Sequence, residues 1–170
     1  PTTGSTTVIT NFVLIPDALP MRTTFTFTLA VSSVSSSGIG KITFTTNGPP
    51  LPGTFTVSPN AGIEFTDKFA LSTLNWEDDD MPIMYAFGMD TGTGLVLPLR
   101  LRDERPDVWV LLPSGQAPSM VVNVIATMYD SLSANVSISV PIVVDTAVSS
   151  SVSAVEQGLI DFRSATTDIG

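Results

Sequence analysis

The sequence predicts an all-β protein built as an antiparallel β-sandwich, and three observations support this class. Thr, Ser and Val are abundant while charged residues make up only 14% of the chain, a balance that favours strands over solvent-facing helices. The stretch from Leu51 to Phe87 contains three runs of alternating apolar residues, separated by turn residues. Trp76 lies between the second and third runs, where a large aromatic side chain can fill the space between two sheets.

This central stretch divides at residues that break a strand. The first run, Thr54 to Val57, ends at a segment containing Pro59 and Gly62, which favour turn dihedrals. The second run extends from Phe65 to Trp76, and four acidic residues followed by Pro82 separate it from the third run. The side chains expected to face the core are Phe69, Leu71, Leu74 and Trp76 of the second run and Ile83, Tyr85 and Phe87 of the third.

The residues before this stretch also predict strands. Pro1 to Thr7 has the composition of a linker, and the apolar run from Val8 to Ile15 predicts a strand. The segment from Thr24 to Val31 alternates apolar and Thr side chains and is the clearest strand of the chain. A serine-rich loop, Ser32 to Gly40, is expected to connect it to a partner strand, Lys41 to Thr46.

The strand pattern predicts tandem modules. Residues 1–48 hold too few strands for an independent sandwich and are predicted to be the closing half of a preceding module. Residues 49–147 are predicted to be a complete module of the fibronectin-III-like or PKD-like, immunoglobulin-like type. Prolines in the joint from Asn47 to Pro52 stiffen it, because each fixes φ and removes a donor. The chain is therefore expected to be a piece of a longer protein.

The remaining strands and the C-terminal segment follow from local patterns. Leu95 to Leu101 predicts a strand, and Pro98 within it favours a sheet edge. The apolar run from Met120 to Met128 predicts a central strand, and the alternating run from Asn135 to Val144 predicts the last strand. Residues 148–170 are predicted to form a linker and a short amphipathic helix, because Ser, Ala, Val and Glu at 153–156 fit a capping box.

The stretch around Trp76 also carries many residues at specific spacings. Its most characteristic members are Trp76, Pro82, Tyr85 and Phe87. The full set is Gly53, Phe55, Val57, Pro59, Gly62, Thr66, Phe69, Leu71, Trp76, Asp78, Asp80, Pro82, Tyr85, Phe87 and Gly88. This pattern resembles the receptor-for-egg-jelly (REJ) region of polycystin-1-like proteins and sperm egg-jelly receptors. Met81 replaces the Leu usual in that family, a volume-conserving change.

The resemblance implies a role outside the cell. Proteins of this family stand at the cell surface of ciliated and flagellated cells, so we expect an extracellular ectodomain segment at such a membrane. It is expected to act as a spacer, an adhesion or interaction module, or a force-bearing module. The partners implied are neighbouring modules of the same chain and a protein or glycan ligand.

Composition excludes several classes of function. The net charge is −9 with only seven basic residues, so the clustered Lys and Arg that nucleic acids and anionic membranes require are missing. No apolar run approaches the roughly 20 residues that span a bilayer, so direct membrane insertion by this segment is not expected. The sequence has no His and no Cys, which excludes the usual nucleophile–base pairs and most zinc sites. No cofactor and no enzymatic activity are therefore predicted.

Acidic residues offer two alternatives to this non-catalytic interpretation. Asp78 and Asp80, with Asp90 further along, could supply the oxygen ligands of a Ca²⁺ site in a calcium-dependent adhesion module, although solvated Asp-Pro turns have the same composition. Asp90-Thr91-Gly92 matches the triplet of aspartic proteases, which need two such aspartates. Since only one copy occurs, a glycine-rich hairpin explains the triplet equally well.

Two further expectations concern the surface. Asn135-Val136-Ser137 is an N-glycosylation acceptor sequence, which would place a glycan on Asn135 if the chain is secreted. Exposed strand edges also leave open a role as the subunit of an extracellular filament, for example in a flagellum or cilium.

Overall fold

A computed structural model of the chain describes residues 11–16 and 18–147. The chain divides into two compact units, Pro1–Gly48 and Pro49–Gly170, here called unit 1 and unit 2. The described residues form strands and no helix, which confirms the all-β prediction. The short helix predicted in residues 148–170 lies outside the described residues.

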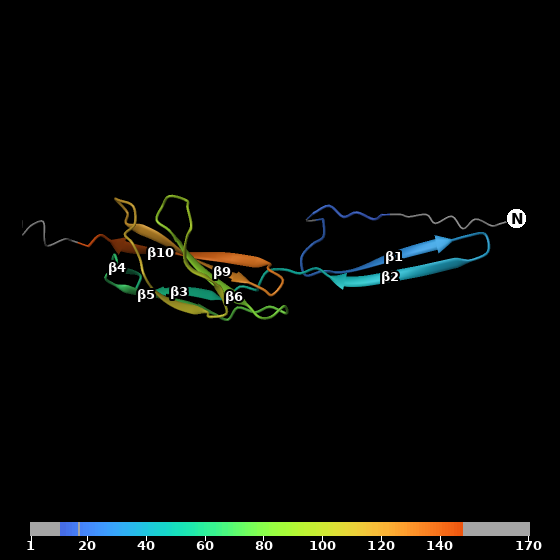
Figure 1. Cartoon of the computed structure of the whole chain (residues 1–170), viewed down its shortest axis with the longest axis horizontal. Coiled ribbons are helices and arrows are strands. Elements are labelled where there is room, and N and C mark those ends of the chain that lie inside the picture. Colours follow the sequence, from blue (N-terminus) through green and yellow to red (C-terminus); the bar gives the residue numbers. More distant parts are fainter. Residues whose placement is uncertain (1–10, 17, 148–170) are drawn as a thin grey trace, which may run out of the picture. The chain divides into compact units, whose positions relative to one another are not determined.

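In unit 1, β1 (Thr24–Ser32) and β2 (Ser37–Thr45) form an antiparallel hairpin (Figure 1). One face of the hairpin is polar, and the Thr24 and Thr45 hydroxyls share a hydrogen bond of 2.9 Å across it. The other face is aromatic, and the rings of Phe27 and Phe44 stack at 5.5 Å. The strands are longer than predicted, because Gly38 and Gly40 belong to β2 rather than to the loop.

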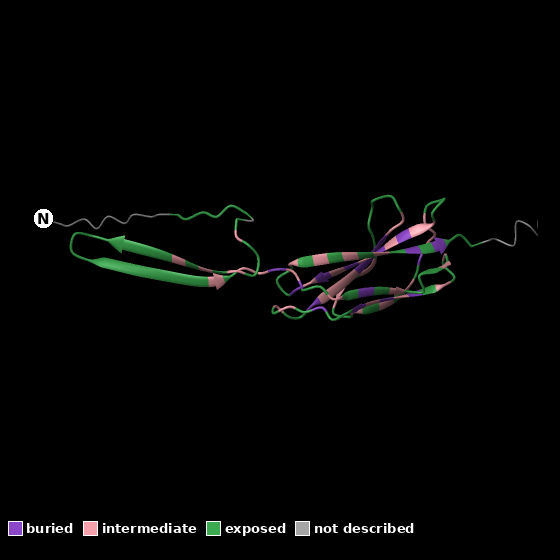
Figure 2. Cartoon of the chain, turned by 180° about the vertical axis from the view of Figure 1, so that it is seen from behind, coloured by how far each residue is buried: buried purple, intermediate pink, exposed green. Residues whose placement is uncertain are grey.

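The strand predicted for Val8 to Ile15 is absent from residues 11–15, which are the part of it that the structure describes. The prediction is therefore wrong for these residues. The ring of Phe12 instead lies 5.2 Å from the ring of Phe27, on the aromatic face of the hairpin. An apolar run becomes a strand only where a partner supplies backbone hydrogen bonds, and apolar content alone does not provide that partner. Most of the described hairpin is exposed (Figure 2).

Residues 49–147 of unit 2 form two sheets. The five-stranded sheet has the order β4-β10-β9-β6-β7, and the three-stranded sheet has the order β3-β5-β8. All pairs are antiparallel except β4 with β10, which is parallel. The strand bounds are β3 (Thr54–Ser58), β4 (Ala61–Ile63), β5 (Lys68–Leu74), β6 (Met84–Asp90), β7 (Leu97–Asp103), β8 (Asp107–Leu111), β9 (Val121–Tyr129) and β10 (Asn135–Asp145).

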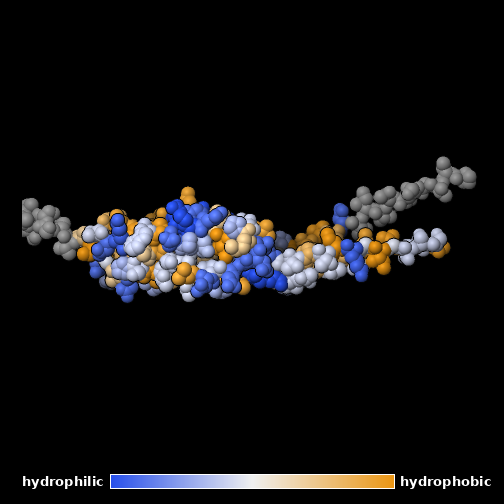
Figure 3. Space-filling view, turned by 90° about the horizontal axis from the view of Figure 1, so that it is seen from below, coloured by the Kyte–Doolittle hydropathy of each residue, from blue (hydrophilic) through white to orange (hydrophobic). Residues whose placement is uncertain are grey.

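The two sheets of unit 2 enclose one apolar core. Phe69 and Leu71 of β5 are fully buried on one side, and Val122 and Val124 of β9 are fully buried on the other. The rings of Phe55 in β3 and Phe87 in β6 lie 6.1 Å apart between the sheets. Buried residues accordingly alternate with less buried ones along β5 and β9 (Figure 2). Hydrophobic side chains also reach the surface among hydrophilic ones (Figure 3).

One core residue of the central stretch was predicted wrongly. Leu74 is 56% exposed, whereas Thr73 is buried. Burial of Thr73 is tolerated because its hydroxyl donates to the carbonyl of Pro106 at 2.9 Å. The alternation of β5 therefore continues through Thr73, and the change of direction occurs at Asn75, where φ is 59°. Trp76 then returns to the core with 8% of its surface exposed.

Strand positions agree with the prolines and with the apolar runs. Pro98 lies in β7, at one edge of the five-stranded sheet, as predicted. β9 is the central strand of that sheet, also as predicted. Every second residue along it is buried. β10 follows the predicted alternation from Val136 to Ile142.

Glu64 holds together three segments at one end of unit 2. Its two carboxylate oxygens accept hydrogen bonds from the backbone N–H groups of Ser114, at 3.2 Å, and Ala147, at 3.1 Å. Hydrogen bonding by the Ser114 side chain and by these two N–H groups lowers the pKa of Glu64 below its ordinary value of 4.5. The carboxylate therefore stabilises the point where the chain leaves β10.

The buried face of β5 should dominate the stability of unit 2. We expect Leu71→Ala to lower the free energy of unfolding by about 2–5 kcal/mol, because it opens a cavity between the sheets. The matched control is Leu101→Ala in β7, where the side chain is 76% exposed and the change should stay within about 0.5 kcal/mol. Urea unfolding measures both variants. Equal losses would contradict the two-sheet core.

The hydrogen bonds that Glu64 accepts from Ser114 and Ala147 predict a dependence of stability on pH. Because the folded-state pKa lies below the unfolded one, the stabilisation is present above pH 4.5 and is lost as the pH falls through the folded value. We expect Glu64→Gln to be less stable than the parent at pH 7 and to lose less stability on acidification. Thermal unfolding from pH 7 to pH 3 measures this, with the exposed Glu104→Gln as the control. Identical pH profiles for parent and Glu64→Gln would refute the assignment.

Candidate functional site

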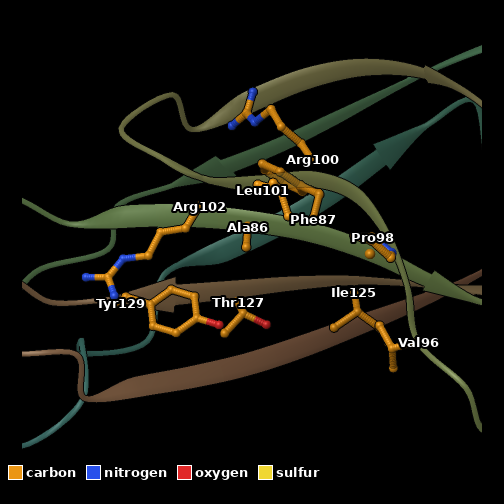
Figure 4. A pocket seen from close by; sticks show the side chains of 11 residues that line it. Ala86, Phe87, Val96, Pro98, Arg100, Leu101, Arg102, Ile125, Thr127 and Tyr129 are labelled. Carbon is orange, nitrogen blue, oxygen red and sulfur yellow. The ribbon is translucent and has the colours of Figure 1, made fainter.

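A hollow of about 320 Å³ lies on the five-stranded sheet, over β6, β7 and β9 (Figure 4). Its lining includes the small residues Ala86 and Gly88 of β6, with Ile125 of β9 beside them. Gly88 permits the close approach of the chain before β7, since a Cβ there would lie 2.8 Å from Cγ1 of Val96. The hollow therefore exists because Ala86 and Gly88, which lie two positions apart on one face of β6, have little or no side chain.

Arg102 and Tyr129 occupy one end of the hollow. The guanidinium carbon of Arg102 lies 4.6 Å from the centre of the Tyr129 ring, and Figure 4 shows the two side chains together. Nη2 of Arg102 donates to the carbonyl of Asp130 at 2.8 Å, and Nη1 donates to Oγ of Ser133 at 3.1 Å. These contacts hold the cation at the rim in a fixed orientation.

Arg100 has a different role on the same strand. Its guanidinium carbon lies 4.9 Å from the centre of the Phe87 ring, and its terminal nitrogens donate to the carbonyls of Asp107 and Arg105. An ion pair of 3.1 Å joins it to Asp103. Burial lowers the pKa of Arg100, and its Nε is a buried donor that makes no hydrogen bond with the described residues. Arg100 thus ties β7 to the beginning of β8.

The chemistry available in the hollow is that of binding. Its lining is mainly apolar, with Arg102 and the hydroxyls of Thr127 and Tyr129 as the polar groups open to a ligand, since the guanidinium of Arg100 is bound to the start of β8. The described residues that line it include no carboxylate that could act as a general base. An apolar group with a hydrogen-bond acceptor or a negative charge at one end fits this lining.

The acidic residues predicted as metal ligands separate into two places. Asp78 and Asp80 come together with Asp130, each offering one carboxylate oxygen within 4.8 Å of the others. The backbone N–H of Asp80 donates to Oδ1 of Asp78 at 2.8 Å, and Oδ1 of Asp130 accepts from the N–H of Ala134 at 2.8 Å. Asp130 is fully buried. Such a group of oxygens is the type that Ca²⁺ binds.

Asp130 was not predicted as a member of this acidic group, because its proximity to Asp80 follows from the pairing of β6 with β9. β6 and β9 are antiparallel, and Met84 is the partner of Tyr129. Residues just before β6 must therefore lie near residues just after β9, which brings Asp80 next to Asp130. The N–H of Ser131 indeed donates to the carbonyl of Asp80 at 2.9 Å. Without knowledge of which strands pair, the sequence cannot show this proximity.

Asp90 lies at the other end of β6, roughly 20 Å along the strand from the acidic group. Its Oδ1 accepts hydrogen bonds from the N–H groups of Gly92, Thr93 and Gly94 at 2.8, 2.9 and 3.1 Å. Gly92 and Gly94 have φ values of 100° and 77°, which favour glycine. Asp90 therefore caps a glycine-rich turn and is not part of the Asp78 and Asp80 group.

The four characteristic residues of the central pattern lie in or beside the core of unit 2 or in the turn before β6. They are Trp76, Tyr85, Phe87 and Pro82. Trp76 is buried, and its Nε1 donates to the carbonyl of Thr54 at 3.3 Å. A Cβ at Gly53 would lie 2.7 Å from Cδ1 of Trp76, so glycine is needed beside the indole. Phe87 is buried in the core, Tyr85 is half-buried, and burial raises the pKa of Tyr85. Pro82 is exposed between the acidic group and β6.

Asn135 of the predicted glycosylation sequence is exposed at the first position of β10. Its Nδ2 donates to the carbonyl of Ser133 at 3.4 Å. The side chain is therefore accessible at the surface of unit 2.

Within the described residues there is no helix of the length and apolar character that a membrane span requires.

Comparison with known proteins identifies the family of the chain. No curated protein matches it significantly. The model of the REJ domain family matches residues 1–168, which is nearly the whole chain and includes the central pattern around Trp76. This chain therefore belongs to the REJ domain family.

Proposed function

We propose that this chain is a non-catalytic extracellular segment of a large polycystin-1-like surface protein, where it acts as a force-bearing spacer and interaction module. Membership in the REJ family supports placement outside the cell, at the surface of a ciliated or flagellated cell. The observation that carries the mechanical role is the parallel pairing of β4 with β10.

The sheet order supports an immunoglobulin-like sandwich of the fibronectin-III or PKD type. Taken in chain order, β3, β5 and β8 correspond to strands A, B and E of such a sandwich. β6, β9 and β10 correspond to C, F and G in the opposing sheet, and β7 extends that sheet beside β6 in the manner of a C′ strand.

The hairpin of unit 1 supports the tandem arrangement. A two-stranded hairpin is marginally stable alone. The apolar face of this one is largely uncovered in the described residues, and Leu29 and Ile42 on it are 65% and 63% exposed. Residues 1–48 would bury this face as the closing half of a preceding sandwich module, which makes neighbouring modules of the same chain its first partners.

The parallel pair between β4 and β10 gives unit 2 resistance to stretching. The chain enters unit 2 before β4 and leaves after β10, so tension pulls the two strands in opposite directions along their common axis. The hydrogen bonds from Val143 N to Asn60 O, at 3.1 Å, and from Glu64 N to Asp145 O, at 2.9 Å, then carry the load together. Bonds that share a load must break together, which raises the barrier to forced unfolding.

The positions of the polar groups support a non-catalytic role. The aspartic hydrolase alternative needs a second aspartate that shares a proton with Asp90. Asp90 instead holds three backbone N–H groups of a turn. The hollow beside Arg102 and Tyr129 provides a surface for a protein or glycan ligand.

Single-molecule pulling on the two ends of the chain tests the mechanical role. We expect Val143→Pro to lower the unfolding force of unit 2 more than Leu71→Ala does, because it removes one bond of the loaded pair. Leu71→Ala leaves that pair intact while lowering equilibrium stability by about 2–5 kcal/mol. If the unfolding forces of the two variants follow their equilibrium stabilities instead, the load does not pass through β4 and β10.

A calcium-dependent adhesion module is the second candidate, favoured by the proximity of Asp78, Asp80 and Asp130. At a free Ca²⁺ of ten times Kd, binding would add about 1.4 kcal/mol to the stability of unit 2. We expect the melting temperature to rise with Ca²⁺ and to fall with EDTA, and Asp80→Asn to abolish both changes. Asp90→Asn is the matched control and should keep them. A melting temperature insensitive to Ca²⁺ and EDTA would eliminate this candidate.

A further inference from the structure

The strands in the described part of unit 2 leave four sheet edges, and three of these carry features that prevent pairing with another chain. β7 contains Pro98 and two shifts of register relative to β6. β4 is only three residues long. β3 leads within a few residues into β4, which belongs to the other sheet, and β3 packs beside β10. The fourth edge is formed by β8.

β8 has none of these features along most of its length. From Val108 to Leu111 it contains neither proline nor charge, and Trp109 and Leu111 are 67% and 45% exposed. Such a strand is rich in residues of high β-propensity. An exposed, apolar edge of this kind is a pairing surface unless something covers it.

The alternation of hydrogen-bonded and non-hydrogen-bonded pairs between β5 and β8 shows which backbone groups of β8 point away from β5. Thr73 N donates to Pro106 O at 2.9 Å, so the pair formed by these two residues is hydrogen-bonded. Since hydrogen-bonded and non-hydrogen-bonded pairs alternate in an antiparallel ladder, Val108 and Val110 bond to β5, and their neighbours point away from it. The outward-pointing N–H and C=O groups therefore belong to Asp107, Trp109 and Leu111.

Arg100 determines which of these groups are available. It donates to the carbonyl of Asp107, which confirms that this carbonyl faces away from β5. Within the described part of the chain, no hydrogen bond outside the strand ladders involves the backbone of Trp109 or Leu111. The residues of this edge that offer both an open donor and an open acceptor are thus Trp109 and Leu111, while Asp107 offers only its N–H.

We propose that this edge pairs with β8 of a second copy of the chain, antiparallel, with the two-fold axis at Val110. In that register Trp109 lies opposite Leu111 of the second copy, and the two residues exchange both hydrogen bonds. The two-fold axis repeats the exchange, so Trp109 and Leu111 of the two copies make four bonds. Asp107, whose carbonyl Arg100 occupies, lies opposite Pro113, which has no N–H to offer. The two three-stranded sheets become one six-stranded sheet.

The side chains agree with this register. Trp109 and Leu111 of the two copies become direct cross-strand neighbours on the outer face, which covers the two most exposed apolar side chains of β8. No two carboxylates face each other across the pair, which matters in a chain of net charge −9. Because so short an edge buries little surface, the dimer should be weak. The inference does not rest on the proposed function, since the pairing needs only the exposed edge.

Disulfide trapping tests the register, because the chain has no cysteine of its own. Val110 and its copy form a non-hydrogen-bonded pair with a Cα separation of about 4.5 Å, which is suitable for a disulfide. Val108 has the same parity and faces the same side, but would lie roughly 13 Å from its copy. We expect Val110→Cys to form a covalent dimer at least about 10-fold faster than the matched control Val108→Cys under mild oxidation. In urea the two rates should become equal.

Sedimentation velocity on the full chain tests the edge itself. The parent should dimerise with a Kd below about 1 mM. Trp109→Pro should weaken the dimer at least about 10-fold without removing a bond to β5, and Trp109→Lys serves the same purpose if the proline variant does not fold. Leu74→Lys, which removes an exposed Leu from β5 of the same sheet, should leave the dimer unchanged.

Three outcomes would overturn the proposal. The first is a parent chain that stays monomeric at about 1 mM, as it would if the edge receives a strand from a different protein. The second is a Leu74→Lys variant that loses the dimer as Trp109→Lys does, which would indicate general hydrophobic association. The third is Val108→Cys crosslinking as fast as Val110→Cys in the native state.

Discussion

The burial of apolar side chains between two sheets is the constraint on which unit 2 depends. Phe69 and Leu71 on β5 face Val122 and Val124 on β9 across a common core, and each sheet would expose its apolar face without the other. This requirement fixes the register of every core strand, because a slip by one residue would turn its apolar side chains to water. The ends and edges of the strands are under no such constraint.

Most of the candidate functional features accordingly lie at those ends and edges, and one, the hollow, lies on the outer face of a sheet. Asp78, Asp80 and Asp130 come together where the segment before β6 meets the end of β9. The carboxylate of Glu64 binds backbone N–H groups where the chain leaves β10. The hollow opens over two positions of β6 that lack large side chains. Arg100 connects β7 to the start of β8 and so limits the part of that edge left open. The core supports these features, and Phe87 contributes to two of them, because it lines the hollow and its ring lies under the guanidinium of Arg100.

Alternation of side chains made much of the core predictable. Phe69, Leu71 and Phe87 are buried as their alternation predicts, because successive side chains of a strand point to opposite faces of the sheet. Leu74 broke the prediction, since burial of Thr73 depends on a hydrogen bond to Pro106, 33 residues further along the chain. The run before residue 16 failed for a related reason: its apolar character says nothing about whether a partner strand is present.

The sequence by itself determined the strand content, the proline at an edge, the central position of β9 and the family pattern around Trp76, because these depend on local periodicity and on residue types. Tertiary structure alone decided that Asp130, and not Asp90, joins Asp78 and Asp80. Asp80 and Asp130 are 50 residues apart in the chain and become neighbours through the antiparallel pairing of β6 with β9, whereas Asp90 lies a strand's length away. Proximity of this kind is a property of strand pairing, which sequence spacing does not contain.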